Sequence, residues 1–273
     1  MSGVISSTRA IADAFVAARQ EARPLDGFPG EQPRDLATSY KIQDEAIALW
    51  RDEVAGWKIG RVQPPQVASL GADRLAGPIF RRNVWVAKGA AVDFPVFERG
   101  FAAVEAEYVF RIGKDAPADK LDWTIDEAAA LIETMHVGVE TAGSPLATIN
   151  DLGATVVVAD FGNNHGLILG PEVPNWRAKL AQGVSCETFI EDKSVGAGGA
   201  SDAPDGPLDA LLFLVRHLAQ RGKPLRAGQL VSTGAVTGVH DIRIGQHSRV
   251  SFNGAGDILC TAVKAAASGR GFS

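Results

Sequence analysis

The sequence predicts an α+β protein with a body made mainly of β-strands. Beyond residue 56, short apolar segments are separated by Pro, Gly and Asp, helical patterns are few, and a strict alternation of strands and helices is absent. We expect one domain over residues 1–273, with a helical N-terminal region over 1–56 and a β-rich body over 57–273.

The composition argues against several classes of protein. The net charge of -5 is unlike that of a general nucleic-acid binder, and no apolar run approaches the roughly 18 residues that a membrane-spanning helix needs. The two cysteines, Cys186 and Cys260, lack the paired spacing of a disulfide framework or a zinc ribbon, and the N-terminus lacks a signal-peptide pattern. We therefore expect a cytoplasmic protein with neither nucleic acid nor a membrane as its partner.

Two helical patterns occupy the N-terminal region. The first, over 7–22, spaces its apolar residues one turn apart, and Ser7 or Ser6 can act as its N-cap. The second, over 35–55, begins at Asp35, whose side chain can act as the N-cap, and Gly56 is expected to end it. The apolar stripe of this second helix consists of Ile42, Ala46, Leu49 and Trp50.

Two more helices and a series of strands are expected in the body. A capping box of Thr124 and Glu127 indicates a helix over 124–137, and another amphipathic pattern runs from Pro207 to Gly222. The Gly-rich segment 195–206 is expected to be a loop. Strands are expected for the apolar runs over 77–80, 83–89, 91–97, 102–113, 154–161, 165–170, 184–192, 229–234 and 248–256.

Glu105 and Glu107 lie one residue apart in the strand pattern FAAVEAEYVF. Side chains alternate along a strand, so both carboxylates point to one face, with Cβ atoms roughly 7 Å apart. They either line the solvated face of an edge strand or bind a divalent ion such as Mg²⁺ or Mn²⁺, which takes oxygen ligands. The opposite face of this strand is apolar and resembles core: Val104, Ala106, Tyr108 and Phe110.

Glu140 is the candidate for a third carboxylate ligand. It lies in VGVET, a strand pattern that is apolar enough to be buried, and a buried glutamate needs a partner. Three carboxylates around one divalent ion would leave coordination positions open for water and a substrate.

Several segments, taken in order, resemble one family. VEAEYVFRIG and VGVETAGS are similar to motifs of the 2-keto-4-pentenoate hydratase and 4-oxalocrotonate decarboxylase branch of the fumarylacetoacetate hydrolase superfamily. GWKIG, LGADRLAGPIF, GQLVSTGA and GQHSRVSFNGAGDI resemble further motifs of that branch. The resemblance spans residues 36–263.

The resemblance implies a fumarylacetoacetase-like fold, a distorted β-roll or barrel with a helical N-terminal region. It implies an active-site lysine, Lys58, and a site for the substrate carboxylate at Thr233 and the backbone of Gly234. It also implies a metal-binding body and a homo-oligomer that associates with a pathway partner enzyme. The implied ligands of one Mg²⁺ or Mn²⁺ are Glu105, Glu107 and Glu140.

The residues themselves leave several roles open. Lys58 is a solvated surface lysine, an amine whose lowered pKa lets it move protons, or a charged amine that holds the substrate carboxylate or orients a water. Hydratases of this family usually carry an acidic residue shortly before the G-x-L-F step, where this chain has Leu75 or Ala76. Asp160 and the two asparagines of the FGNNHG run that follows it, Asn163 and Asn164, are expected mainly to shape a turn. Structural or surface roles are expected for His136, His165 and His240.

The expected function is that of a divalent-metal-dependent lyase acting on an enolised 2-keto acid, and hydration of a 2-hydroxy-2,4-dienoate is favoured. A 2-keto carboxylate can chelate a divalent ion, which stabilises the charge that grows on the keto oxygen. The alternatives are decarboxylation of a 4-oxalocrotonate-type diacid and C–C hydrolysis of the fumarylacetoacetate type. A catalytically silent scaffold or partner subunit forms a second class, because the acidic residue near Leu75 is missing.

Overall fold

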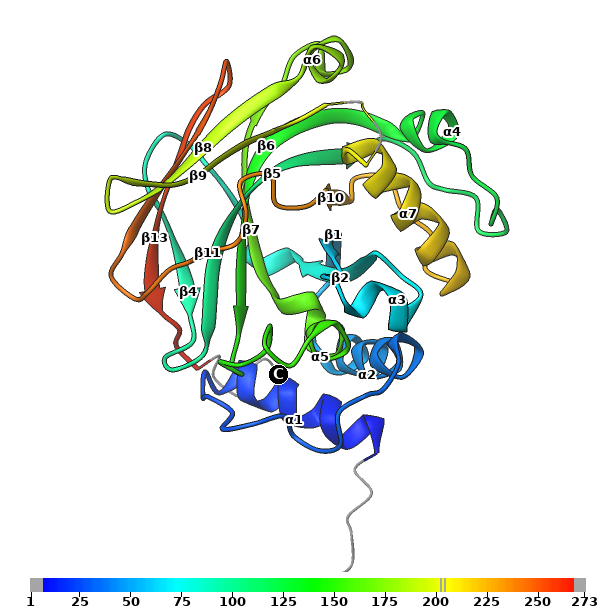
Figure 1. Ribbon diagram of the computed structural model, residues 1–273, viewed down its shortest axis with the longest axis vertical. Coiled ribbons are helices and arrows are strands. Elements are labelled where there is room, and N and C mark those ends of the chain that lie inside the picture. Colours follow the sequence, from blue (N-terminus) through cyan, green and yellow to red (C-terminus); the bar gives the residue numbers. More distant parts are fainter. Residues whose placement is uncertain (1–6, 202, 204, 268–273) are drawn as a thin grey trace, which may run out of the picture.

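The computed structural model describes residues 7–201, 203 and 205–267, which fold around two curled β-sheets (Figure 1). The larger sheet contains, in spatial order, β2 (Arg74–Phe80), β1 (Val54–Arg61), β10 (Leu230–Ser232), β5 (Phe101–Ile112), β6 (Ile132–Ser144), β7 (Asn164–Glu172) and β3 (Val84–Val86), while β11 (His240–Asp241) pairs with β5. The smaller sheet contains β4 (Val92–Val96), β13 (Gly256–Lys264), β12 (His247–Phe252), β8 (Val184–Ile190) and β9 (Lys193–Ala200). The predicted α+β fold with a mainly β body is confirmed.

Short helices surround these sheets. Figure 1 shows α1 and α2 together at one end of the molecule, below the curled sheets, and α7 along one side. Leu211, Leu214 and Leu218 of α7 are buried in the main apolar core. The helices are α1 (Thr8–Gln20), α2 (Leu36–Leu49), α3 (Gln66–Leu70), α4 (Ile125–Ala129), α5 (Ala154–Ala159), α6 (Trp176–Gln182) and α7 (Pro207–Gln220), with 3-10 turns η1 (Arg81–Asn83) and η2 (Phe161–Asn163).

The N-terminal helices begin where the sequence places their caps. The Ser7 hydroxyl accepts a hydrogen bond from the Ala10 backbone N–H, and Asp35 accepts one from Thr38. The expectation that Gly56 ends the second helix is wrong, because α2 stops at Leu49 and Gly56 lies inside β1. A Cβ on Gly56 would lie 2.2 Å from the Leu230 carbonyl oxygen, so this glycine is required by the close approach of β10.

The expectation of a helix over 124–137 is correct only for the first part of that range. The capping box of Thr124 and Glu127 is present, but α4 ends at Ala129 and β6 begins at Ile132. Residues of β6 pair with β5 from Ile132, opposite Ile112, to Ser144, opposite Phe101. This long ladder of backbone hydrogen bonds outweighs the local helical pattern.

Two other expectations are also wrong. Residues 154–159 form α5 rather than a strand, because a short valine run does not distinguish a buried strand from a helix that is buried against α2. Half of the segment expected as a loop, 195–206, is strand: β9 extends through Ala200 and pairs with β8. Residues 202 and 204 of that expected loop lie outside the described residues.

Strand β5 is an interior strand of the larger sheet. It lies between β10 and β6, and its apolar side chains Val104, Ala106, Tyr108 and Phe110 belong to the main core, as expected. The other face of β5 points into the curl of the larger sheet and carries the two glutamates. No helix among the described residues combines the length and apolar character that crossing a membrane requires.

Candidate metal centre and active site

Strands β5 and β6 bring three glutamates together. Glu105 is directly opposite Glu140 in the antiparallel register, and Glu107 lies two residues further along β5. One carboxylate oxygen from each residue lies within 4.8 Å of the other two. Their exposed fractions are 4%, 0% and 0%, so the solvated edge-strand alternative is wrong.

Glu107 and Glu140 are each only partly hydrogen-bonded. Oε2 of Glu107 accepts hydrogen bonds from the Ser232 hydroxyl, at 2.5 Å, and from the Gly234 backbone N–H, at 2.9 Å. Oε1 of Glu140 accepts one from the Asn164 amide at 3.0 Å. The remaining oxygens, Oε1 of Glu107 and Oε2 of Glu140, are buried without a hydrogen-bond partner among the described residues. Because an unpaired buried carboxylate oxygen is costly, these atoms fit the ligand set of a hard divalent ion.

Burial also perturbs the acidity of the site. Desolvation raises the pKa of Glu105 to about 7, with Lys58 opposing the shift and Glu140 adding to it. Desolvation and the charges of Glu140 and Glu105 raise the pKa of Glu107 well above its usual range. The three carboxylates therefore need either protons or a cation, and a divalent ion would allow all of them to ionise.

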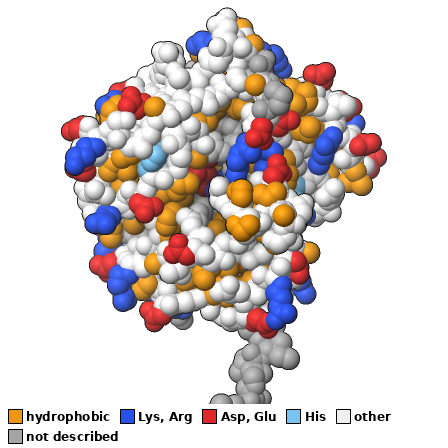
Figure 2. Space-filling view, viewed as in Figure 1, with side chains coloured by type: hydrophobic (Ala, Val, Ile, Leu, Met, Phe, Trp, Pro, Cys, Tyr) orange, Lys and Arg blue, Asp and Glu red, His pale blue; other side chains and the backbone are white. Residues whose placement is uncertain are grey.

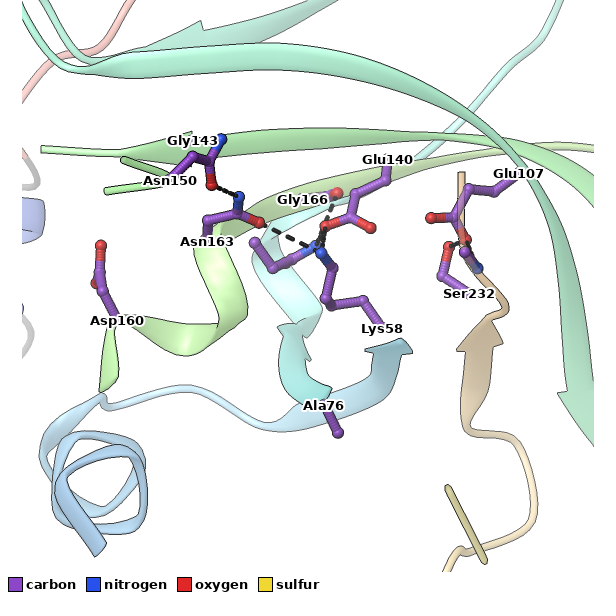
Figure 3. A network of polar contacts seen from close by, with 12 residues as sticks. Lys58, Ala76, Glu107, Glu140, Gly143, Asn150, Asp160, Asn163, Gly166 and Ser232 are labelled. Carbon is purple, nitrogen blue, oxygen red and sulfur yellow. Dashed lines mark hydrogen bonds and ion pairs between the residues drawn. The ribbon is translucent and has the colours of Figure 1, made fainter. Parts of the chain in front are cut away.

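Lys58 approaches this cluster from β1. The side chain of its neighbour Trp57 is buried in the main core, and Lys58 lines the cavity described below. Its Nζ lies 3.2 Å from Oε1 of Glu140 and donates to Oδ1 of Asn163 at 3.3 Å (Figure 3). The side chain is only 4% exposed, so the surface-lysine alternative is wrong.

The charge of Lys58 is set by two opposing effects. Burial alone would lower its pKa, but the carboxylates of Glu140, Glu105 and Glu107 outweigh burial, and the pKa of Lys58 is raised. Of the alternatives open from the sequence, a charged amine beside the carboxylates is favoured over an amine with a lowered pKa.

A cavity of about 810 Å³ opens next to this cluster. The residues expected to hold the substrate carboxylate, Thr233 and Gly234, line it together with Lys58, Glu105 and Leu75. The Thr233 hydroxyl donates to the Tyr108 carbonyl oxygen, and the Gly234 N–H donates to Glu107, so both donors already have protein partners. Their role toward a substrate stays a prediction.

The FGNNHG segment contributes more than the expected turn. It does form a turn, with Gly162 at φ 65°, but the two asparagines also contact the site. Asn163 accepts from Lys58 and donates to Asn150 (Figure 3). Asn164 donates to Glu140. Sequence spacing offered no signal for these contacts, because Glu140 and Asn164 lie in different strands.

A buried ion pair anchors that turn to the first helix. Nε of Arg19, on α1, donates to Oδ1 of Asp160 at 2.5 Å, and the Ser144 hydroxyl donates to Oδ2 of Asp160 at 2.6 Å. The Arg19 guanidinium also donates to the carbonyl oxygens of Asn164 and Gly143. Arg19 thus fixes the backbone that carries both asparagines, a role that its surface-like place in a helical pattern did not reveal.

His136, His165 and His240 lie outside the cavity lining. Burial and the adjacent Arg19 lower the pKa of His165 to about 3, so it is neutral and packs against Phe97. A ring nitrogen of His136 lies 3.1 Å from the Gly170 carbonyl oxygen, and one of His240 lies 3.2 Å from the Thr237 hydroxyl.

Known proteins resemble this chain in sequence and in fold. A TodF product hydratase from Pseudomonas putida is 30% identical over 250 residues, covering 89% of each chain, and a 2-keto-4-pentenoate hydratase from Paraburkholderia xenovorans is 28% identical over 255 residues, covering 90% of this chain and 91% of the relative. The solved structure of 4-oxalocrotonate decarboxylase from Pseudomonas putida G7, complexed with magnesium and adipate, has a similar fold, with a TM-score of 0.75 over 94% of this chain and 97% of that chain at 19% identity. No family model matches the chain.

Proposed function

This chain belongs to the 2-keto-4-pentenoate hydratase and 4-oxalocrotonate decarboxylase branch of the fumarylacetoacetate hydrolase superfamily, and from that membership we propose that it is a divalent-metal-dependent lyase acting on an enolised 2-keto acid. Hydration of a 2-hydroxy-2,4-dienoate is the reaction that we favour. The observation that carries the proposal is the trio of buried glutamates beside a cavity, two of them with an unpartnered carboxylate oxygen.

We assign the ion, Mg²⁺ or Mn²⁺, to Glu105, Glu107 and Glu140. When bound, it would supply Lewis-acid stabilisation of the negative charge that develops on the keto oxygen of an enolising substrate. Ser232 and the Gly234 N–H orient the Glu107 carboxylate, and Asn164 orients that of Glu140. Such contacts fix the direction of ligand oxygens before an ion arrives.

Lys58 is the residue that we assign to the substrate. Its charged amine lies at the cavity wall, held by Glu140 and Asn163, where it can bind the substrate carboxylate or donate a proton from Nζ. Leu75, which with Ala76 lies near the place where the family resemblance leads us to expect an acid in hydratases, lines the cavity. The acidic side chains of the described cavity lining are Glu105 and Asp205, so we assign proton transfer to Lys58 or to water.

Decarboxylation of a 4-oxalocrotonate-type diacid is the second candidate, and Leu75 is the observation that favours it. A decarboxylase needs no side chain to activate a water for addition, so an apolar residue at this place is compatible with that reaction. C–C hydrolysis of the fumarylacetoacetate type ranks third, because it requires an activated water, and an apolar residue at this place cannot activate one.

A side-by-side product assay tests these candidates. Purified protein would be incubated with Mg²⁺ or Mn²⁺ and either 2-hydroxypenta-2,4-dienoate or 4-oxalocrotonate. Loss of the dienoate chromophore without carbon dioxide would support hydration, and release of carbon dioxide from the diacid would support decarboxylation. Conversion of neither acid, together with no metal binding by calorimetry, would favour the scaffold or partner-subunit alternative.

A further inference from the structure

Gln43 of α2 joins two walls of the cavity through one buried amide. It has an exposed fraction of 0%, and its Nε2 donates to the Ala76 carbonyl oxygen at 2.9 Å and to the Val158 carbonyl oxygen at 3.0 Å. Ala76 follows Leu75 in β2, Val158 follows Val157 in α5, and both Leu75 and Val157 line the cavity. The amide therefore uses both of its donors, one on each wall.

Arg221, which directly follows α7, determines which way this amide points. Its Nη2 donates to Oε1 of Gln43 at 3.0 Å and to Oδ1 of Asp44 at 2.5 Å. A guanidinium has only donors and a peptide carbonyl only acceptors, so Oε1 of Gln43 must face Arg221 and Nε2 must face the two carbonyl oxygens. Cζ of Arg221 is itself held 4.4 Å from the ring centroid of Tyr40 and 5.6 Å from that of Trp57.

Tyr40 completes the contact between α2 and β2. Strand β2 is at one end of the larger sheet, and the backbone N–H of Ala76 donates to the Tyr40 hydroxyl at 3.0 Å. Tyr40 and Gln43 lie three residues apart, on one face of α2, so that together they satisfy both backbone polar groups of Ala76 in place of a further strand. Ala76 is opposite Ile59 in β1, so this contact is made one residue away from Lys58.

The Val158 end of the Gln43 contact leads to the turn that holds Lys58. Five residues after Val158, Asn163 accepts a hydrogen bond from Nζ of Lys58. Gly77, opposite Lys58, is in backbone contact with the same turn, because a Cβ on Gly77 would lie 2.1 Å from the Phe161 carbonyl oxygen. A change in the spacing between β2 and α5 would therefore move Asn163 relative to Lys58.

The Gln43 amide acts from the interior of the protein. Helix α2 packs beside α5, below β2 (Figure 1). Figure 2 shows Lys or Arg side chains next to Asp or Glu side chains near the centre of this face, over the part of the molecule where Figure 1 labels β1 and β2. Gln43, by contrast, is fully buried, and its hydrogen bonds among the described residues go to β2, α5 and Arg221 rather than to Glu105, Glu107 or Glu140.

We propose that Gln43 is a positioning residue of the active site, which holds β2 against α5 with the help of Tyr40 and Arg221. This inference rests on the proposed function, because the group that is positioned is the Lys58 amine that we assign to the substrate. Gln43 lies outside the cavity lining and acts through the backbone, by setting the distance between Lys58 and Asn163 and so the direction of Nζ. A misplacement of about 1 Å in such a group costs up to about 100-fold in rate.

Gln43→Met tests this proposal, because methionine has a similar length and no amide. The measured quantity is kcat per Mn²⁺-binding site, from steady-state kinetics with the acid that the product assay shows to be converted and from calorimetry that counts the sites. We expect it to fall about 10–100-fold, with Mn²⁺ affinity unchanged because the three glutamates keep their contacts. Gln43→Glu should lower kcat at least as much, because a carboxylate cannot donate to the two carbonyl oxygens. Tyr40→Phe keeps the ring beside Arg221 and should lower kcat by a smaller factor, because it removes only one contact to Ala76.

Ser39→Ala is the matched control. Ser39 is a buried polar residue of the same helix, with an exposed fraction of 0%, but its hydroxyl donates to the carbonyl oxygen of Asp35, the N-cap of α2 itself. Its loss should lower Tm and leave kcat per Mn²⁺ site unchanged.

A purely structural Gln43 would behave like Ser39. A lower Tm with unchanged kcat per Mn²⁺ site in Gln43→Met would overturn the inference and leave the proposed function standing, and so would a loss of Mn²⁺ affinity as large as the loss of kcat. If melting shows that Gln43→Met does not fold, Tyr40→Phe decides, and an unchanged kcat per site in that variant would overturn the inference. Conversion of neither acid by the natural protein would overturn the proposed function, and the inference with it.

Discussion

Glu107, one of the three proposed metal ligands, offers the clearest test at the residue scale. Glu107→Gln keeps an acceptor for Ser232 and Gly234 but removes a buried charge that faces Glu105 and Glu140. We expect loss of Mn²⁺ binding by isothermal titration calorimetry, with the fold intact and the metal-free protein at least as stable as the natural one, because repulsion between buried carboxylates falls.

Glu133→Gln is the control for this substitution. Glu133 lies on the same strand, β6, as Glu140 but is exposed, so Mn²⁺ affinity should not change. If Mn²⁺ affinity were unaltered in Glu107→Gln as well, Glu107 would not be a ligand.

Lys58 allows a second test at the residue scale. Lys58→Met removes the amine and leaves all three glutamates, so Mn²⁺ binding should persist while kcat falls at least about 100-fold, the usual contribution of a proton-transferring side chain. Steady-state kinetics separates the roles, since a rise in KM with unchanged kcat would show that Lys58 only binds the substrate. Lys120→Met, which removes a more exposed lysine paired with Glu127, should change neither constant.

At the scale of elements, the contact between α1 and the turn at η2 links the N-terminal helix to the site. Arg19→Met leaves the Asp160 carboxylate buried without its cation, which is expected to cost about 3–5 kcal/mol of unfolding free energy in a denaturant titration. Activity should fall too, because the same turn carries Asn163 and Asn164. Arg19→Lys keeps the charge but loses the forked contacts of the guanidinium. We therefore expect a loss of unfolding free energy that is smaller than that of Arg19→Met.

Another arginine of α1 provides the matched comparison. Arg9 pairs with Asp13 on the exposed side of the helix, and Arg9→Met should cost less than about 1 kcal/mol. Equal losses for Arg9→Met and Arg19→Met would contradict the assignment of Arg19 as an anchor.

At the scale of the whole molecule, the buried glutamates make stability depend on both pH and metal. The pKa of Glu105 rises from 4.5 to about 7 on folding, so between these values the folded metal-free protein holds a proton that the unfolded chain has released. The free energy of unfolding contributed by this group therefore falls as pH rises through that window. Bound Mn²⁺ replaces the proton and should remove this penalty.

The measurement is the Tm shift caused by Mn²⁺, which we expect to be larger at pH 8 than at pH 5. His165 acts in the opposite direction, because its lowered pKa makes the folded protein lose stability as pH falls below 6.5. The contribution of His165 is the same with and without Mn²⁺, so it cancels in the Tm shift. A shift of the same size at both pH values would contradict the role given to Glu105, and Glu107→Gln should show no shift.

Assembly stays a prediction at this scale. The family resemblance implies a homo-oligomer and a pathway partner enzyme, and sedimentation of the purified chain, alone and mixed with a candidate partner, would measure both. The division into a helical region and a β-rich body within one domain likewise stays a prediction, although β1 already begins at Val54, before the expected boundary at 57.

Local chemistry explains what could be predicted from the sequence by itself. The alternation in β5 placed Glu105 and Glu107 on one face and the core residues on the other, because the period of a strand is a property of the backbone. Asp35 and the capping box at Thr124 marked helix starts, and Ser7 was one of two serines expected to cap the first helix, because a cap depends on residues three positions away. Glu140 was proposed as the third ligand from its buried strand pattern and from family resemblance rather than from spacing.

Only the tertiary structure decided which distant groups meet. The β5–β6 register sets Glu105 opposite Glu140, and the ion pair of Arg19 and Asp160 joins residues 141 positions apart. The same holds for Asn163 at Lys58 and for Arg61 opposite Arg74. Each of these contacts depends on sheet register and on the packing of α1 and η2, which arise when the whole chain buries its apolar faces, and no local pattern of residues encodes such a distance.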